Sequence, residues 1–127
     1  MKILFIITGS IAVSKCYDIL GELKKHKIEV NCIITNNAKK LLNISKLKNS
    51  ISGKVYTEES EKKEKMLHIN LSRKNDLIVV CPATANTIAK FANGYADNLA
   101  STTLLASNKP IIFIPAMNTM MWNNPIN

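Results

Sequence analysis

Apolar and polar positions follow each other along the chain in blocks. Four short, mainly apolar runs are rich in strand-forming side chains, at residues 3–7, 28–34, 77–81 and 110–114. A continuous run such as 3–7 is typical of a parallel strand that is covered on both faces. Between the runs, apolar side chains recur at helical spacing, which predicts helices from residue 11, over 85–92 and over 97–106. This order predicts an α/β fold, with a doubly wound, mainly parallel sheet and helices on both faces.

Breaker and capping residues mark the ends of these elements. Side-chain oxygens at 35–37 can cap a helix that begins near Ala38, and Gly94 is placed to end the helix of residues 85–92. Pro82 is expected to end the third strand. The mixed-charge stretch 58–65 lacks apolar periodicity, so we expect a solvated loop or a short exposed helix there and assign it no function.

Length and composition narrow the class of protein. The 127 residues, 46% of them hydrophobic, can bury one core, so residues 1–127 are expected to form a single domain. No apolar run approaches the roughly 20 residues of a membrane span, and the first run lacks the cleavage site of a signal peptide. The three cysteines, Cys16, Cys32 and Cys81, lie in apolar segments without disulfide or metal-ligand spacing. They are expected to be reduced core thiols in a cytoplasmic protein.

The charge of the chain raises the question of nucleic-acid binding. The net charge is +8, but sixteen of the seventeen cations are lysines spread along the sequence, and Arg73 is the only arginine. Bidentate base contacts need guanidinium groups. We therefore interpret the lysines as a solvated surface that favours, at most, phosphorylated ligands.

Candidate binding residues follow the apolar runs, because ligands of doubly wound sheets bind outside the carboxyl ends of the strands. Gly9, Ser10 and Ile11 open a helix after the first run, where free N–H groups can hold a phosphate, although a plain tight turn fits equally well. The chain has neither a GxGxxG fingerprint nor a Walker A loop. After the third run, the small and polar string Thr84, Ala85, Asn86 and Thr87 lets a planar ligand approach the backbone, although Thr84 alone is explained by helix capping.

Two further residues are candidates for chemistry. His68 lies between apolar neighbours, where a structural histidine is the commoner case, but it can also transfer protons near neutral pH. Asn118 follows the last run, in Pro-Ala-Met-Asn, and its amide can bind a carboxylate without a buried cation. A turn-forming asparagine is the simpler alternative. Another set of apolar residues can cover a ligand or pack against the domain or another subunit: Met117, Met120, Met121 and Trp122.

Taken together, these segments resemble the flavin-dependent cysteine decarboxylase family over essentially the whole chain. The segments that carry the resemblance are Gly9-Ser10-Ile11-Ala12 with Lys15, His68-Ile69-Asn70-Leu71, the string from Pro82 to Lys90, Gly94 with Asp97-Asn98-Leu99, and Pro115-Ala116-Met117-Asn118 continuing to Met121-Trp122. The last segment is the most specific. It favours the branch of the family that acts in coenzyme A biosynthesis on phosphopantothenoylcysteine.

The resemblance implies a Rossmann-like flavoprotein fold, FMN as the cofactor and a role for each matching residue. The catalytic histidine would be His68, and Asn118 would bind the substrate carboxylate. The residues that would bind FMN are Gly9, Ser10, Ile11, Thr35, Thr84, Ala85, Asn86, Thr87 and Ala116. The flavin would oxidise the cysteine thiol to a thioaldehyde, an electron sink for the loss of carbon dioxide, and would then reduce the resulting enethiol to phosphopantetheine. The family forms trimers with FMN at the subunit interface.

One departure from the family pattern bears on activity. The family carries a mobile substrate clamp with a catalytic cysteine after the Pro-Ala-Met-Asn segment, and the sequence stops at Asn127. We therefore expect a domain without its clamp. A non-catalytic FMN-binding regulatory module and a decarboxylase of another C-terminal cysteine substrate remain as alternatives, as does an electron-transfer flavodoxin, for which the basic charge is a poor match.

Overall fold

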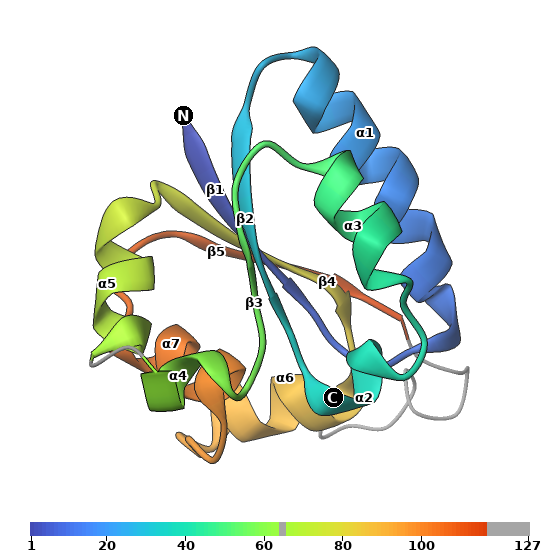
Figure 1. Ribbon diagram of the computed structural model, residues 1–127. Helices are drawn as coiled ribbons and strands as arrows, with labels where there is room; N and C mark the ends of the chain where they lie inside the picture. Colours follow the sequence, from blue (N-terminus) through green and yellow to red (C-terminus); the bar gives the residue numbers. More distant parts are fainter. Residues whose placement is uncertain (64–65, 117–127) are drawn as a thin grey trace.

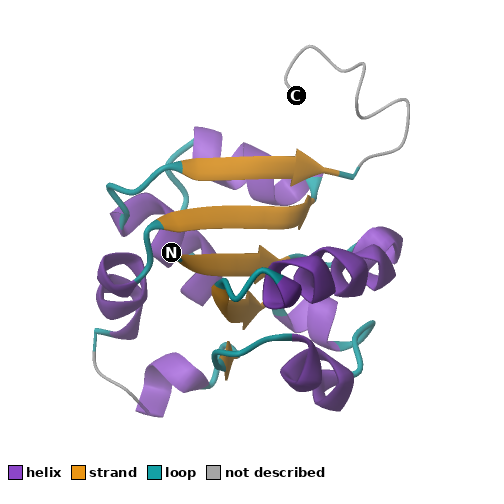
Figure 2. Ribbon diagram, turned by 90° about the horizontal axis from the view of Figure 1, so that it is seen from above, coloured by secondary structure: helices purple, strands orange, loops and turns teal. Residues whose placement is uncertain are grey.

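A five-stranded parallel sheet forms the centre of the molecule (Figure 2). The computed structural model describes residues 1–63 and 66–116. The strands are β1 (Lys2–Ile7), β2 (Glu29–Ile34), β3 (Val55–Tyr56), β4 (Leu77–Ala83) and β5 (Ile111–Pro115). The four apolar runs predicted as strands are all confirmed, and so is their parallel arrangement.

The strand order across the sheet is β3-β2-β1-β4-β5. The chain builds outward from β1 to β2 and β3, then crosses over to β4 and β5 on the other side of β1. The direction of winding thus reverses between β1 and β4, which pair from Ile3 with Leu77 to Ile6 with Val80. In open α/β sheets this reversal opens a crevice at the carboxyl ends of the strands, where ligands bind.

Helices cover both faces of the sheet (Figure 1). Successive side chains of a strand point to opposite faces, so β1 divides its apolar residues between two cores. Phe5 belongs to the core under α1 (Cys16–Lys25) and α3 (Ile44–Ser50), while Leu4 and Ile6 belong to the core under α5 (Leu67–Lys74) and α7 (Leu99–Ala106). All three side chains are fully buried. The doubly wound α/β prediction is therefore confirmed.

The first helical segment differs in detail from the prediction. It opens as the 3₁₀ helix η1 (Ile11–Lys15) and becomes α-helical only in α1. Within α1, Cys16 and Leu20 are buried, whereas Ile19 is 36% exposed.

Two of the short elements between β2 and β4 were anticipated. The helix expected near Ala38 is α2 (Asn36–Lys39), which begins two residues earlier, and α4 (Ser60–Lys63) is a short helix without buried residues in the mixed-charge stretch. The elements α3 and β3 lack an apolar periodicity and were not predicted. The helix α5 was also missed, although Leu67 and Leu71 are buried at a spacing of four. The sheet consequently has one strand more than the four that were predicted.

The expected end of the third strand was wrong. β4 runs through Pro82, which follows a cis peptide bond, and ends at Ala83. The ladder between β4 and β5 shifts register between Val80 and Ala83. Proline has no N–H to donate to a ladder, so it is tolerated where the regular pairing is interrupted. The predicted stop of α6 (Ala85–Ala92) is confirmed: Gly94 has φ of 68°, and its N–H donates to the carbonyl of Phe91.

The three cysteines are buried and free, as predicted for core thiols. Burial raises the pKa of Cys32 to about 12, so its thiol stays protonated at neutral pH. The Cys16 thiol donates to the carbonyl oxygen of Cys81 at 3.2 Å. Among the described residues, no helix is long and apolar enough to cross a bilayer.

Candidate functional site

A polar hollow of about 240 Å³ opens at the carboxyl ends of β1, β2 and β4, beside the point where the winding reverses. Its walls come from the loops after these strands, from the start of α6 and α7, and from the segment after β3. The lining residues are Thr8, Gly9, Thr35, Asn36, Asn37, Glu58, Thr84, Asn86, Thr87, Lys90, Asn98, Ala100 and Ser101. Most of these side chains are hydroxyls and amides, which can both donate and accept hydrogen bonds.

Five of the nine residues expected to bind the cofactor line this hollow: Gly9, Thr35, Thr84, Asn86 and Thr87. The others lie close by in the chain. The Ser10 hydroxyl accepts from the N–H of Ala12 and caps η1, which begins at Ile11. Ala85 is the first residue of α6, and the N–H of Ala116 donates to the carbonyl of Ala83. The structure thus brings together the turns after three separate strands.

Thr8 connects the ends of β1 and β4 and was not singled out from the sequence. Its side chain is buried, its hydroxyl donates to the carbonyl oxygen of Pro82, and its Oγ1 accepts from the N–H of Thr84 at 3.2 Å. One hydroxyl therefore satisfies two backbone groups across the winding reversal. This contact holds the turn after β1 against the start of α6.

Gly9 forms the contact between the turn after β1 and the start of α2. A Cβ atom at this position would lie 2.5 Å from Cβ of Asn37 and 3.1 Å from its backbone carbon. Real side chains do not approach so closely, so only glycine allows the two turns to meet. Gly9 thus lies in a tight turn, and this turn forms part of the wall of the hollow.

Two threonines that line the hollow also cap helices. Thr35 accepts from the N–H of Ala38 at 3.3 Å, and Thr84 accepts from the N–H of Thr87 at 3.2 Å. The Thr84 and Thr87 hydroxyls are 3.0 Å apart. Thr84 therefore caps α6, as the capping interpretation of the sequence predicted. Because the first turn of α6 lines the hollow, the positive end of the helix dipole lies there as well.

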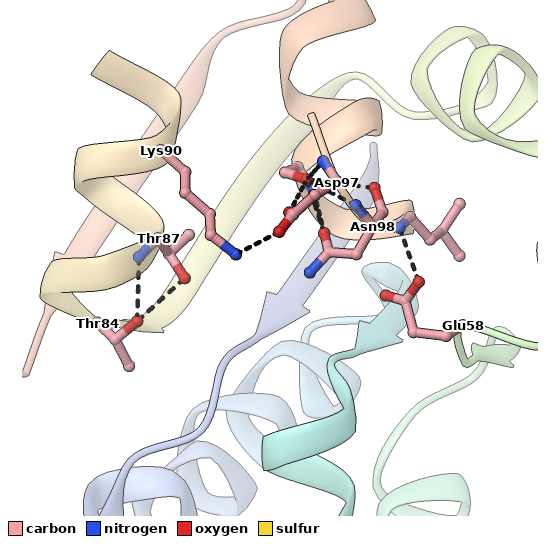
Figure 3. A network of polar contacts seen from close by, with 8 residues as sticks. Glu58, Thr84, Thr87, Lys90, Asp97 and Asn98 are labelled. Atoms are coloured by element: carbon pink, nitrogen blue, oxygen red, sulfur yellow. Dashed lines mark hydrogen bonds and ion pairs between the residues drawn. The ribbon is translucent and has the colours of Figure 1, made fainter. Parts of the chain in front are cut away.

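A network of polar side chains connects α6 with the start of α7, as Figure 3 shows. Lys90 of α6 reaches the Asp97 carboxylate at 2.8 Å, and this hydrogen bond lowers the pKa of Asp97. Asn98 and Ser101 form a capping box at the start of α7, in which Oδ1 of Asn98 accepts from the N–H of Ser101 at 2.8 Å. Glu58 accepts from the N–H of Leu99 at 2.9 Å. The network joins α6, α7 and the segment after β3.

Replacing Asn98 with alanine tests the capping box. The change leaves the N–H of Ser101 without its acceptor, so the free energy of unfolding is expected to fall by about 1 kcal/mol. Urea denaturation of the purified chain measures it. Asn49→Ala, at an exposed position of α3, is the matched control and should cause no loss. Equal stability of the two variants would show that the cap does not stabilise α7.

His68 is in the first turn of α5 and is not among the residues that line the hollow. Its Nδ1 atom is 2.7 Å from Oε1 of Glu61, and 23% of its side chain is exposed. A carboxylate that accepts from Nδ1–H would fix the ring orientation and leave Nε2 for proton transfer. The geometry therefore fits an imidazole whose orientation is fixed by Glu61. Glu61 belongs to the mixed-charge stretch 58–65, to which no function was assigned from the sequence.

Asn118 and the apolar residues Met120 to Trp122 lie outside the described residues, so the role expected for Asn118 stays a prediction. Within the described residues, no cluster of three or more His, Cys, Asp or Glu side chains is arranged to hold a metal ion.

The polar lining of the hollow offers groups for both a phosphate and a hydrogen-bond donor. The start of α6 presents an N-terminal dipole and the Thr84 and Thr87 hydroxyls, which suit a phosphate. One oxygen of Glu58 is buried without a hydrogen-bond partner among the described residues, and a ligand donor would satisfy it. The fold and the hollow thus define a doubly wound α/β domain with a polar hollow at the winding reversal.

The chain belongs to the Flavoprotein family, whose sequence profile matches residues 1–127. A probable phosphopantothenoylcysteine decarboxylase from Streptococcus mutans is 38% identical over 98% of this chain and 72% of that protein. A coenzyme A biosynthesis bifunctional protein, CoaBC, from Methanocaldococcus jannaschii is 41% identical over 96% of this chain but only 30% of that protein. Epidermin decarboxylase from Staphylococcus epidermidis is 38% identical over 98% of this chain and 67% of that protein.

Solved structures of similar proteins share the fold over nearly the whole chain. The FMN-dependent cysteine decarboxylase TvaF from thioviridamide biosynthesis superposes with a TM-score of 0.92 at 26% identity, over 99% of this chain and 79% of that one. A PPC decarboxylase mutant complexed with pantothenoylaminoethenethiol superposes with a TM-score of 0.87 at 35% identity, over 98% of this chain and 71% of that one. The resemblance to flavin-dependent cysteine decarboxylases is therefore confirmed.

Proposed function

We propose that this chain is the FMN-binding part of an enzyme that decarboxylates phosphopantothenoylcysteine to phosphopantetheine in coenzyme A biosynthesis. The observation that carries the proposal is the hollow, where Gly9, Thr35, Thr84, Asn86 and Thr87 meet from the turns after three strands. Family membership and the names of the similar decarboxylases support the reaction class.

FMN would be held by residues that the fold already orients. Thr84, Asn86 and Thr87 at the start of α6 would receive the phosphate, and the tight turn at Gly9 would let the ligand approach the backbone. When bound, the flavin supplies the redox chemistry, accepting two electrons from the substrate thiol and returning them after carbon dioxide leaves. The protein supplies orientation, exclusion of water and proton transfer.

Two residues are proposed to act on the substrate. His68, held by Glu61, would exchange a proton with the substrate through Nε2. Asn118 would bind the carboxylate that is lost, because a neutral amide can donate to it without the desolvation cost of a buried cation. The preference for the coenzyme A substrate rests on the Pro115-Ala116-Met117-Asn118 sequence. Assembly as a homotrimer, with the flavin at the subunit interface, is proposed from the same resemblance.

Mass spectrometry of phosphopantothenoylcysteine incubated with the FMN-loaded chain tests the reaction. The expected product is phosphopantetheine, or the enethiol if final reduction needs residues beyond this chain. The Asn118→Ala variant should form neither product while retaining FMN. If Asn118→Ala forms product at the wild-type rate, Asn118 does not have the proposed role. If the wild-type chain binds FMN but converts no substrate, the proposed reaction is contradicted for this chain.

A second candidate function is decarboxylation of a peptide that ends in cysteine. The observation that favours it is the 38% identity to epidermin decarboxylase, equal to that of the Streptococcus mutans protein. A peptide ending in cysteine, offered beside phosphopantothenoylcysteine in the same assay, separates the two candidates. We expect the phosphorylated substrate to be consumed first.

A further inference from the structure

Glu58 combines a place in the wall of the hollow with an unsatisfied oxygen. It follows β3, and its Oε2 atom accepts from the N–H of Leu99 at 2.9 Å. Its other oxygen, Oε1, is buried and has no hydrogen-bond partner among the described residues. Figure 3 shows Glu58 below the start of α7, at the right of the picture, with Thr84 and Thr87 at the left. No role was assigned to it from the sequence.

Helix capping accounts for one oxygen of Glu58, because the N–H of Leu99 needs a single acceptor and the positive end of the α7 dipole favours a carboxylate. The second oxygen, Oε1, has no part in this cap. Burial raises the pKa of Glu58 most, the hydrogen bond from Leu99 lowers it, and the carboxylates of Glu61, Glu59 and Asp97 raise it further.

Two described lysines of this region, Lys90 and Lys39, are paired with other carboxylates. Lys90 also lines the hollow, but its ammonium group is bound to Asp97 at 2.8 Å. Lys39 is 4.0 Å from Glu59, the exposed neighbour of Glu58. An unpaired buried oxygen therefore remains at the ligand site, at a cost to the stability of the ligand-free protein.

We propose that the free oxygen of Glu58 accepts a hydrogen bond from a donor group of the bound flavin, either a ribityl hydroxyl or the N–H of the ring. The proposal rests on the proposed function, in which the hollow holds FMN. A carboxylate repels a phosphate, so Glu58 would also keep the phosphate at the Thr84 and Thr87 end. Glu58 is thus a specificity-determining residue that fixes the direction in which the ligand lies.

Glu58→Gln tests the proposal, with Glu59→Gln as the matched control. Glutamine keeps the size of the side chain and an acceptor for Leu99, but it cannot also offer a carboxylate oxygen to a donor. FMN affinity, measured by quenching of flavin fluorescence on the full chain, is expected to fall roughly tenfold or more for Glu58→Gln. It should stay within twofold for Glu59→Gln, because 55% of the Glu59 side chain is exposed.

Thermal unfolding of the ligand-free variants separates a ligand role from a structural one. Glu58→Gln is expected to melt at the same temperature as the wild type or higher, because an unpaired buried charge is removed. Lower stability together with weaker binding would point to a structural residue and overturn the proposal. Glu58→Asp is the second variant: it keeps the charge but is too short to reach both Leu99 and the ligand, so weaker binding is expected again.

3-Methyl-FMN, in which the ring N–H is blocked, identifies the donor. If the ring N–H is the donor, the wild type binds 3-methyl-FMN more weakly and Glu58→Gln adds no further loss. If a hydroxyl is the donor, the loss caused by Glu58→Gln is the same for both flavins. Unchanged or tighter FMN binding by Glu58→Gln overturns the inference alone, whereas a wild-type chain that binds no FMN overturns the proposed function and this inference with it.

Discussion

Replacing His68 with glutamine is expected to lower the rate of decarboxylation by about 10²- to 10⁴-fold, the usual contribution of a positioned proton-transfer group. FMN affinity should stay unchanged, because His68 is not among the residues that line the hollow. The measurement is the rate of product formation by the FMN-loaded variant, followed by mass spectrometry. A loss of rate with full flavin content separates a chemical role from a defect in folding or cofactor binding.

The chain contains a matched control, since its only other histidine is His26 at the exposed end of α1. His26→Gln should keep the wild-type rate. Glu61→Gln removes the carboxylate at 2.7 Å from Nδ1 and should reduce the rate less than His68→Gln, because the imidazole remains but is less firmly oriented. A wild-type rate for His68→Gln would leave this residue as a structural histidine on α5.

Gly9→Ala is expected to lower the free energy of unfolding by about 1–3 kcal/mol, the usual cost of an added methyl group in a packed position. The new Cβ would lie 2.5 Å from Cβ of Asn37 and 3.3 Å from the backbone nitrogen of Ala38, so α2 would have to move. FMN binding should weaken with it, because this movement displaces the wall formed by Thr35, Asn36 and Asn37. Urea denaturation and fluorescence titration measure the two effects.

Gly21→Ala is the matched control, with an effect of opposite sign. Gly21 is inside α1, and a Cβ atom there would meet nothing within 4 Å. Alanine in a helix interior stabilises by about 0.5–1 kcal/mol relative to glycine. Equal stabilities of the two variants would mean that the turn after β1 can absorb a side chain, and the close approach of Gly9 to α2 would then have no consequence.

The strands could be predicted because each carries its own local signal. The run 77–81 forms β4, which is buried on both faces, and four apolar runs were recognised as strands. The run 110–114 forms β5, where Ile112 and Ile114 stay exposed, so an apolar run predicts a strand but not full coverage. β3 has only Val55 and Tyr56, too few residues for a pattern, and it exists because its backbone pairs with β2. α5 was missed because two buried leucines among polar residues are a weak signal.

Part of the candidate site could be predicted for a similar reason. Thr35, Thr84 and Asn86 come directly after strands, and parallel strands bring such positions to one edge of the sheet. Nothing in the local sequence shows that Thr8 joins Pro82 to Thr84, because the partners are more than seventy positions away. Glu58 was not predicted either, because in the sequence it is one of several charged residues in the mixed-charge stretch 58–65.

From the residues alone it was possible to predict that strands and helices alternate, that the sheet is parallel, and therefore which edge carries the candidate ligand residues. These features follow from hydrophobic periodicity, which is local and repeats within each element. The contacts of Glu58 with the first turn of α7, of Lys90 with Asp97 and of Glu61 with His68 depend on the folded molecule. Polar partners of this kind are selected by the packing of whole elements against each other, so their pairing has no signature in the residues around them.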